Sequence, residues 1–82
     1  MAGPFRLAPN EVQSQIPTWA LGKETLVIVD CADDGLFEMT AGGSPSETTS
    51  VKAGSNEFSR NFGGVLLAVK NLTNGDITVT TA

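Results

Sequence analysis

The side chains of this sequence that could bind a metal or act in catalysis are its carboxylates and one thiol. Asp30, Asp33 and Asp34 precede Gly35, and clustered carboxylates on a loop suit a hard cation such as calcium. Their spacing does not fit the calcium-binding loop D-x-[DN]-x-[DN]-G, and Asp-Gly is typical of a solvated hairpin turn. We therefore predict a turn and no metal site, with a calcium site as the alternative.

The sequence lacks residues that nucleophilic catalysis usually requires. The chain has no histidine to cycle protons near neutral pH. Cys31, the only cysteine, ends an apolar run and is predicted to be a small buried hydrophobic residue. A single thiol also excludes an intrachain disulfide and a Cys/His zinc cluster. The sequence therefore predicts a protein that is not an enzyme, with no catalytic residues and no cofactor.

The charge and the apolar runs bear on partners and location. The net charge is −4 with only five basic residues, whereas nucleic-acid binding needs a basic stripe. No apolar run approaches the roughly 20 residues that span a bilayer, and the first residues lack the pattern of a signal peptide. We expect no nucleic acid, no membrane and no small-molecule substrate as partners, and use without secretion.

β-Branched and apolar residues separated by turn residues fill the chain from Thr25 onward. The expected strands are 25–31, 36–40, 49–53, 57–62, 65–71 and 76–81. About six short strands with regularly spaced turns predict an all-β fold, a small antiparallel β-sandwich or barrel.

The last two strands are expected to form a hairpin. An Asn-Gly loop of two residues would place Lys70 opposite Val79. A three-residue loop with a bulge places Val69 opposite Val79 instead and turns Lys70 toward water together with Thr78. The second register separates apolar from polar side chains better, so we predict the bulged hairpin.

Residues 1–22 differ from the β domain that we expect over residues 23–82. They hold three of the four prolines, Pro4, Pro9 and Pro17, and proline fixes φ and removes a backbone donor. We predict an extended N-terminal arm. Two alternatives stay open, a frayed tail and an arm that docks on a partner or on its own sheet.

The size of the chain favours association. A domain this short has a marginal core of its own, and strand 25–31 is apolar on both faces, Leu26 and Ile28 against Val27 and Val29. Either the N-terminal arm or a neighbouring subunit would cover the second face, so we expect a homo-oligomer or a partner-dependent fold. The residues predicted to contact a partner are Phe5, Leu7, Val12, Ile16, Trp19, Val27, Val29 and Leu66.

Residues 53–82 resemble small structural proteins of tailed-phage heads. The pattern that carries the resemblance comprises Ala53-Gly54, Phe58, Asn61, Gly63, Leu67, Val69, Asn71 and Thr78-Val79-Thr80. The resemblance implies a decoration, cement or fibre-like role on the capsid, with the major capsid protein or another virion protein as partner. It implies synthesis in the bacterial cytoplasm and a final location in the virion. The alternative is a small β binding module or inhibitor that acts on a bacterial host protein.

Overall fold

Eight β-strands make up the regular structure of this chain, whose residues 2–82 are described by a computed structural model. The strands are β1 (Ala2–Leu7), β2 (Val12–Ile16), β3 (Thr25–Cys31), β4 (Gly35–Ala41), β5 (Glu47–Val51), β6 (Gly54–Arg60), β7 (Leu67–Asn71) and β8 (Ile77–Thr81). All six strands expected from the sequence are present, with shifted bounds for most of them. β1 and β2 are additional, and the prediction of an all-β fold is confirmed.

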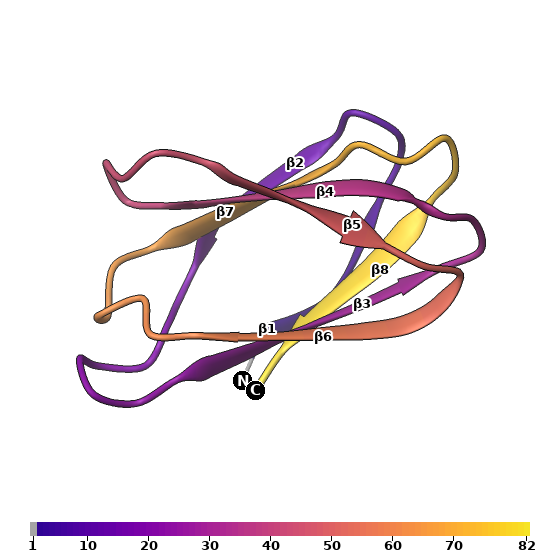
Figure 1. The fold of residues 1–82 in the computed structure, drawn as a ribbon. Coiled ribbons are helices and arrows are strands. Elements are labelled where there is room, and N and C mark those ends of the chain that lie inside the picture. Colours follow the sequence, from indigo (N-terminus) through magenta and orange to yellow (C-terminus); the bar gives the residue numbers. More distant parts are fainter. Residues whose placement is uncertain (1) are drawn as a thin grey trace.

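The strands form two antiparallel sheets of four that pack face to face (Figure 1). One sheet has the order β1-β8-β3-β6 and the other the order β2-β7-β4-β5. Only β4 and β5 are consecutive in the chain and also neighbours in a sheet; every other connection between described strands crosses between the layers. This is the strand order of a jelly roll, a sandwich built from two Greek keys.

The predicted C-terminal hairpin does not form. β7 pairs with β2 and β4, whereas β8 pairs with β1 and β3, so residues 72–76 cross from one sheet to the other. Val79 lies opposite Val29, and Val69 lies opposite Met39. The predicted bulged register is therefore wrong, and so is the two-residue alternative, because turn residues that suit a hairpin serve equally well in a crossing loop.

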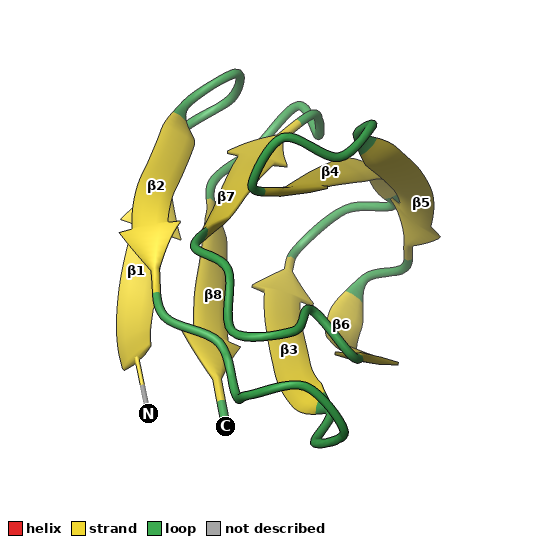
Figure 2. Ribbon diagram, turned by 90° about the vertical axis from the view of Figure 1, so that its left-hand side faces the viewer, coloured by secondary structure: helices red, strands yellow, loops and turns green. Residues whose placement is uncertain are grey.

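The N-terminal segment belongs to the sandwich and is not an arm beside it. In the β1–β8 ladder Leu7 lies opposite Ile77, and in the β2–β7 ladder Ile16 lies opposite Leu67. β1 and β2 thus form one edge of each sheet (Figure 2). A bulge or irregularity interrupts each ladder, as is common at sheet edges.

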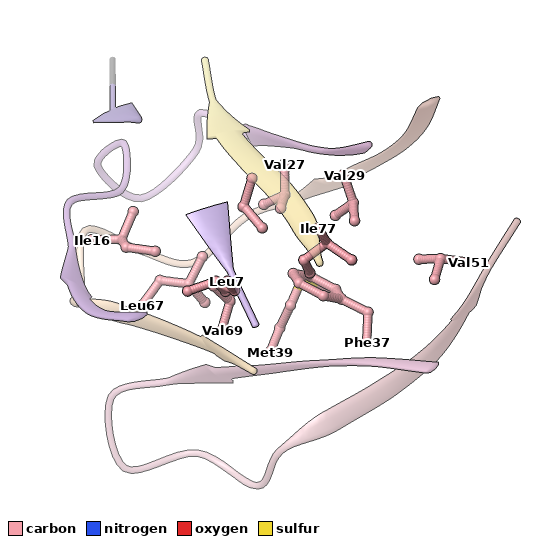
Figure 3. Close-up of a cluster of buried hydrophobic side chains, with 11 residues drawn as sticks. Leu7, Ile16, Val27, Val29, Phe37, Met39, Val51, Leu67, Val69 and Ile77 are labelled. Carbon is pink, nitrogen blue, oxygen red and sulfur yellow. The ribbon is translucent and has the colours of Figure 1, made fainter. Parts of the chain in front are cut away.

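Side chains from both sheets meet in one core between the layers (Figure 3). In β3, Val27 and Val29 point into this core and are buried, while Leu26 and Ile28 are half-buried on the outer face. The buried hydrophobic residues are Leu7, Ile16, Val27, Val29, Phe37, Met39, Val51, Leu67, Val69, Ile77 and Val79.

The two ends of the sandwich carry different loops. Residues 17–24, 42–46 and 61–66 connect strands at the left-hand end in Figure 1, which faces the viewer in Figure 2. The remaining connections lie at the opposite end. The two chain termini lie beside each other, because Ala2 is opposite Thr81 in the first ladder.

Candidate functional site

The loops at the two ends differ sharply in charge. We call residues 17–24, 42–46 and 61–66 the apolar end, because Lys23 and Glu24 are the only charged residues among them and their charges balance. The loops of the opposite end are residues 8–11, 32–34, 52–53 and 72–76, and we call them the acidic end. Their charged residues are Glu11, Asp33, Asp34, Lys52 and Asp76.

A tight turn projects Leu21 from the apolar end. The Lys23 N–H donates to the Ala20 carbonyl at 3.1 Å, and Gly22 has a φ of 93°, which together are typical of a type II turn. Gly22 suits this position because a side chain there would be strained. Leu21 occupies the apex and is 84% exposed.

The base of this turn is fixed by Trp19. Its backbone N–H donates to the Thr25 hydroxyl at 2.9 Å, at the start of β3. The Lys23 ammonium lies 3.6 Å from the centroid of the Trp19 ring, a cation–π contact. The half-buried indole therefore holds the charged group close to the protein surface.

Hydrogen bonds join the loops of the apolar end into one surface. The Thr18 hydroxyl donates to the Val65 carbonyl at 2.6 Å, linking residues 17–24 to residues 61–66. The Gly42 N–H donates to the Leu66 carbonyl at 2.9 Å, linking the third loop. Val65 is 43% exposed and Leu66 is 48% exposed.

The structure does not bring the residues predicted to contact a partner together on one surface. Leu7, Ile16, Val27 and Val29 are core residues, since burial on an inward-facing strand position removes them from the surface. Phe5 is half-buried against the core, and Val12 is exposed where β2 begins, near the acidic end. Only Trp19 and Leu66 lie at the apolar end.

Leu21 and Val65 belong to the same surface but were missed from the sequence. The available signal for Leu21 was an apolar residue directly before Gly22 in a turn, where a polar residue is the usual choice. Val65 was expected inside a strand, and only the loop packing shows that it is exposed.

At the acidic end, Asp34 has a structural role. Asp34 accepts from the Ala53 N–H at 2.8 Å, and its other oxygen lies 4.0 Å from Lys52 Nζ, so it fixes the turn between β5 and β6. Across residues 2–82 no three His, Cys, Asp or Glu side chains gather as metal ligands would.

Cys31 lies beside the same turn. Its thiol donates to the Lys52 carbonyl at 3.0 Å. Burial raises the pKa of this thiol above its ordinary value, and Asp30, Asp33 and Asp34 add to the shift, which a hydrogen bond from Asn56 opposes. The neutral thiol is therefore favoured over the reactive thiolate.

An ion pair joins the two sheets on the side where β5 and β6 form the edges. The Arg60 guanidinium on β6 binds Glu47 on β5 through Nη2 at 2.7 Å and through Nε at 3.1 Å. These hydrogen bonds hold the pKa of Glu47 below its usual range. On the same strand as Arg60, the Phe58 ring stacks on Phe37 across the layers, with centroids 6.3 Å apart.

The surface of residues 2–82 has no pocket. The part of the chain that the structure describes also has no helix long and apolar enough to cross a membrane. The apolar end is the place where exposed apolar side chains from different loops come together.

Comparison with known proteins places this chain among uncharacterized relatives. Two uncharacterized proteins of Dictyostelium discoideum are each similar to it, with 40% identity over 84 residues that cover 100% of this chain and 100% of the relative. No solved structure matches it significantly.

These relatives correct the functional interpretation drawn from residues 53–82. They come from a eukaryote, which contradicts a phage capsid decoration or cement role and a location in the virion. An inhibitor of a bacterial host protein loses its basis for the same reason. The description "Family of unknown function (DUF8244)" matches residues 5–82, and the chain therefore belongs to the DUF8244 family.

Proposed function

We propose that this protein is a non-enzymatic binding domain whose working surface is the apolar end. The observation that carries the proposal is the convergence of Leu21, Val65 and Leu66 on loops whose only charged residues are Lys23 and Glu24. Scattered apolar residues are normal on any protein surface. Several of them gathered on one patch are typical of a surface that binds something.

The chemistry of the remaining side chains supports a role without catalysis. The chain lacks histidine, and its one thiol has a raised pKa. A jelly roll hosts many unrelated functions, so the fold alone does not choose among them. The proposal therefore rests on the surface and not on the architecture.

Three single substitutions test whether the apolar end is the working surface. Leu21→Ser and Leu66→Ser remove exposed apolar groups from it. Leu36→Ser is the matched control, because Leu36 is 46% exposed and lies on β4, outside the apolar end. Each tagged protein is incubated with a homogenate of Dictyostelium discoideum, and its retention in the particulate and soluble high-mass fractions is measured.

We expect the wild type and Leu36→Ser to be retained equally and the two variants of the apolar end to be lost from the same fraction. Equal behaviour of all four proteins would show that the apolar end is not the working surface.

Self-association remains a prediction of its own. Leu26 and Ile28 are half-buried on the outer face of β3, which a second copy could cover. Sedimentation of the purified protein over a range of concentrations measures the oligomeric state directly. The expected lack of a nucleic-acid or small-molecule partner also remains a prediction.

A further inference from the structure

We infer that the partner of the apolar end is the surface of a lipid bilayer, which the domain meets end-on with Leu21 foremost. This inference rests on the proposed binding function and names its partner. It departs from the expectation of no membrane partner, which followed from the lack of a long apolar run. Docking on a bilayer surface requires only a few apolar side chains and no spanning segment.

The size of the apolar end favours a bilayer over a protein partner. The Cα atoms span 33 × 21 × 18 Å, and the strands run along the long axis (Figure 1). The apolar end is thus one of the two narrow faces of the molecule, and its exposed large apolar side chains are Leu21, Val65 and Leu66. A standard protein–protein interface takes roughly 20–30 residues from each partner. A bilayer surface, in contrast, needs no complementary shape.

The residues of the apolar end match the chemistry of the membrane interface. Trp19 has an apolar ring and a polar N–H, the combination that is enriched at the level of the lipid headgroups. Lys23 can bury its aliphatic stem and keep its ammonium among the headgroups. Leu21, which is 84% exposed at the apex of the turn, would enter the boundary with the acyl chains.

The distribution of charge favours the same orientation. Lys23 and Glu24 are the only charged residues within residues 17–24, 42–46 and 61–66, so these loops carry no net charge. The carboxylates of Asp33, Asp34 and Asp76 belong to the opposite end of the long axis of 33 Å. A Debye length is about 8 Å at physiological salt. The charge of the acidic end is therefore screened from a bilayer that the apolar end faces, and the charges of Lys23 and Glu24 offset each other.

The loops of the apolar end are already fixed in place. The Thr18–Val65 and Gly42–Leu66 hydrogen bonds and the anchor of Trp19 on Thr25 hold them together. A preorganised surface loses less conformational freedom when it binds. Preorganisation therefore strengthens the binding that each inserted side chain provides.

Vesicle binding tests the inference with the full chain. Large unilamellar vesicles of phosphatidylcholine, with and without phosphatidylserine, are sedimented with each protein and the bound fraction gives a partition coefficient. Trp19, the only tryptophan, reports on its own surroundings. We expect its emission to shift to the blue with both kinds of vesicle. The partition coefficient should change little with phosphatidylserine, because Glu24 offsets the charge of Lys23.

The variants locate the contact. Leu21→Ser should lower the partition coefficient about tenfold or more, the loss expected for one leucine side chain that stays in water. Leu66→Ser should lower it less, and Leu36→Ser should leave it unchanged. Lys23→Ala should lower the partition coefficient about fivefold with phosphatidylserine vesicles. With phosphatidylcholine vesicles it should change the partition coefficient little.

Two results overturn the inference. Wild type that stays in the supernatant with both vesicles shows that a bilayer is not the partner. Binding that Leu21→Ser leaves intact shows that the apolar end is not the contact. If vesicles fail but Leu21→Ser still abolishes retention in the soluble homogenate fraction, the proposed binding function stands and its partner is a protein.

Discussion

Asn71 is fully buried where the loop after β7 meets the end of β1. Its amide nitrogen donates to the carbonyls of Leu7 at 3.0 Å and Gly75 at 2.7 Å. Its oxygen accepts from the N–H of Thr73 at 2.8 Å and from the hydroxyl of the same residue at 2.7 Å. One side chain thus satisfies the polar groups of a loop that crosses between the sheets. The sequence Asn71-Leu72-Thr73 matches a glycosylation acceptor, yet its nitrogen is buried and bonded in the folded chain.

Asn71→Asp is expected to destabilise the fold strongly. The substitution keeps the shape but turns an acceptor oxygen toward two carbonyls and buries a charge. We expect a loss of about 3 kcal/mol or more in the free energy of unfolding at neutral pH, measured by urea denaturation. Asn74→Asp, on an exposed residue three positions later, is the control and should stay within about 0.5 kcal/mol of wild type. Equal losses in the two variants would contradict this account.

Gly35 shows what a residue type alone can and cannot predict. The sequence explains it as a turn residue that adopts a positive φ, but its φ lies outside that region. A Cβ at position 35 would instead lie 2.8 Å from Thr73 Cγ2 and 3.0 Å from Thr73 Cα. The glycine permits a close approach between two distant segments, and no local pattern reveals such a contact.

At the scale of elements, the sequence identified strands better than it identified their partners. The alternation of Val27 and Val29 with Leu26 and Ile28 correctly predicted a strand with two apolar faces. The chain reverses after β3 and after β7 with ordinary turn residues, and in both places it enters the other sheet. The same residue types suit a hairpin turn and a loop that crosses between sheets. Which strands pair therefore depends on the whole fold.

The two N-terminal strands were hidden for a different reason. β1 contains a proline, and β2 is largely polar, with the sequence VQSQI. Edge strands tolerate both features because one of their sides has no ladder to complete. The candidate site was likewise recovered only in part, since Trp19 and Leu66 stood out as apolar residues while Leu21 depended on a turn in three dimensions.

The Glu47–Arg60 pair predicts a dependence of stability on pH. The pKa of Glu47 is lowered in the folded state, so its contribution is present above the unfolded pKa of about 4.3 and is lost as pH falls through the folded pKa. Both side chains are more than a third exposed, at 44% and 38%, and solvent screening limits the effect to about 1 kcal/mol.

Glu47→Gln should therefore be less stable than wild type near pH 7, and the difference should vanish in acid. Urea denaturation at both pH values measures it. Asp76→Asn breaks the more exposed pair with Arg6, within one edge of one sheet, and should change stability less. A difference between wild type and Glu47→Gln that persists unchanged in acid would assign the effect to packing.

At the scale of the whole molecule, the contacts that complete each sheet are far apart in the chain. The first strand pairs with the last, and the third pairs with the sixth and the eighth. Topologies of this kind fold slowly, because long loops must close before their contacts form. We expect refolding on the millisecond-to-second scale, which stopped-flow circular dichroism measures. Refolding within microseconds would contradict the non-local strand order.

Because the two ends of the chain lie beside each other, the strands can be connected in a different order. Ala2 faces Thr81 across a ladder, so a short bridge between the ends would close the backbone into a ring without moving either strand. A new opening at Gly43, where a side chain would meet no neighbouring atom within 4 Å, would then give the same sandwich with β5 first and β4 last. The eight strands could therefore be connected in circularly permuted orders that give the same sandwich, and the natural order is one of them.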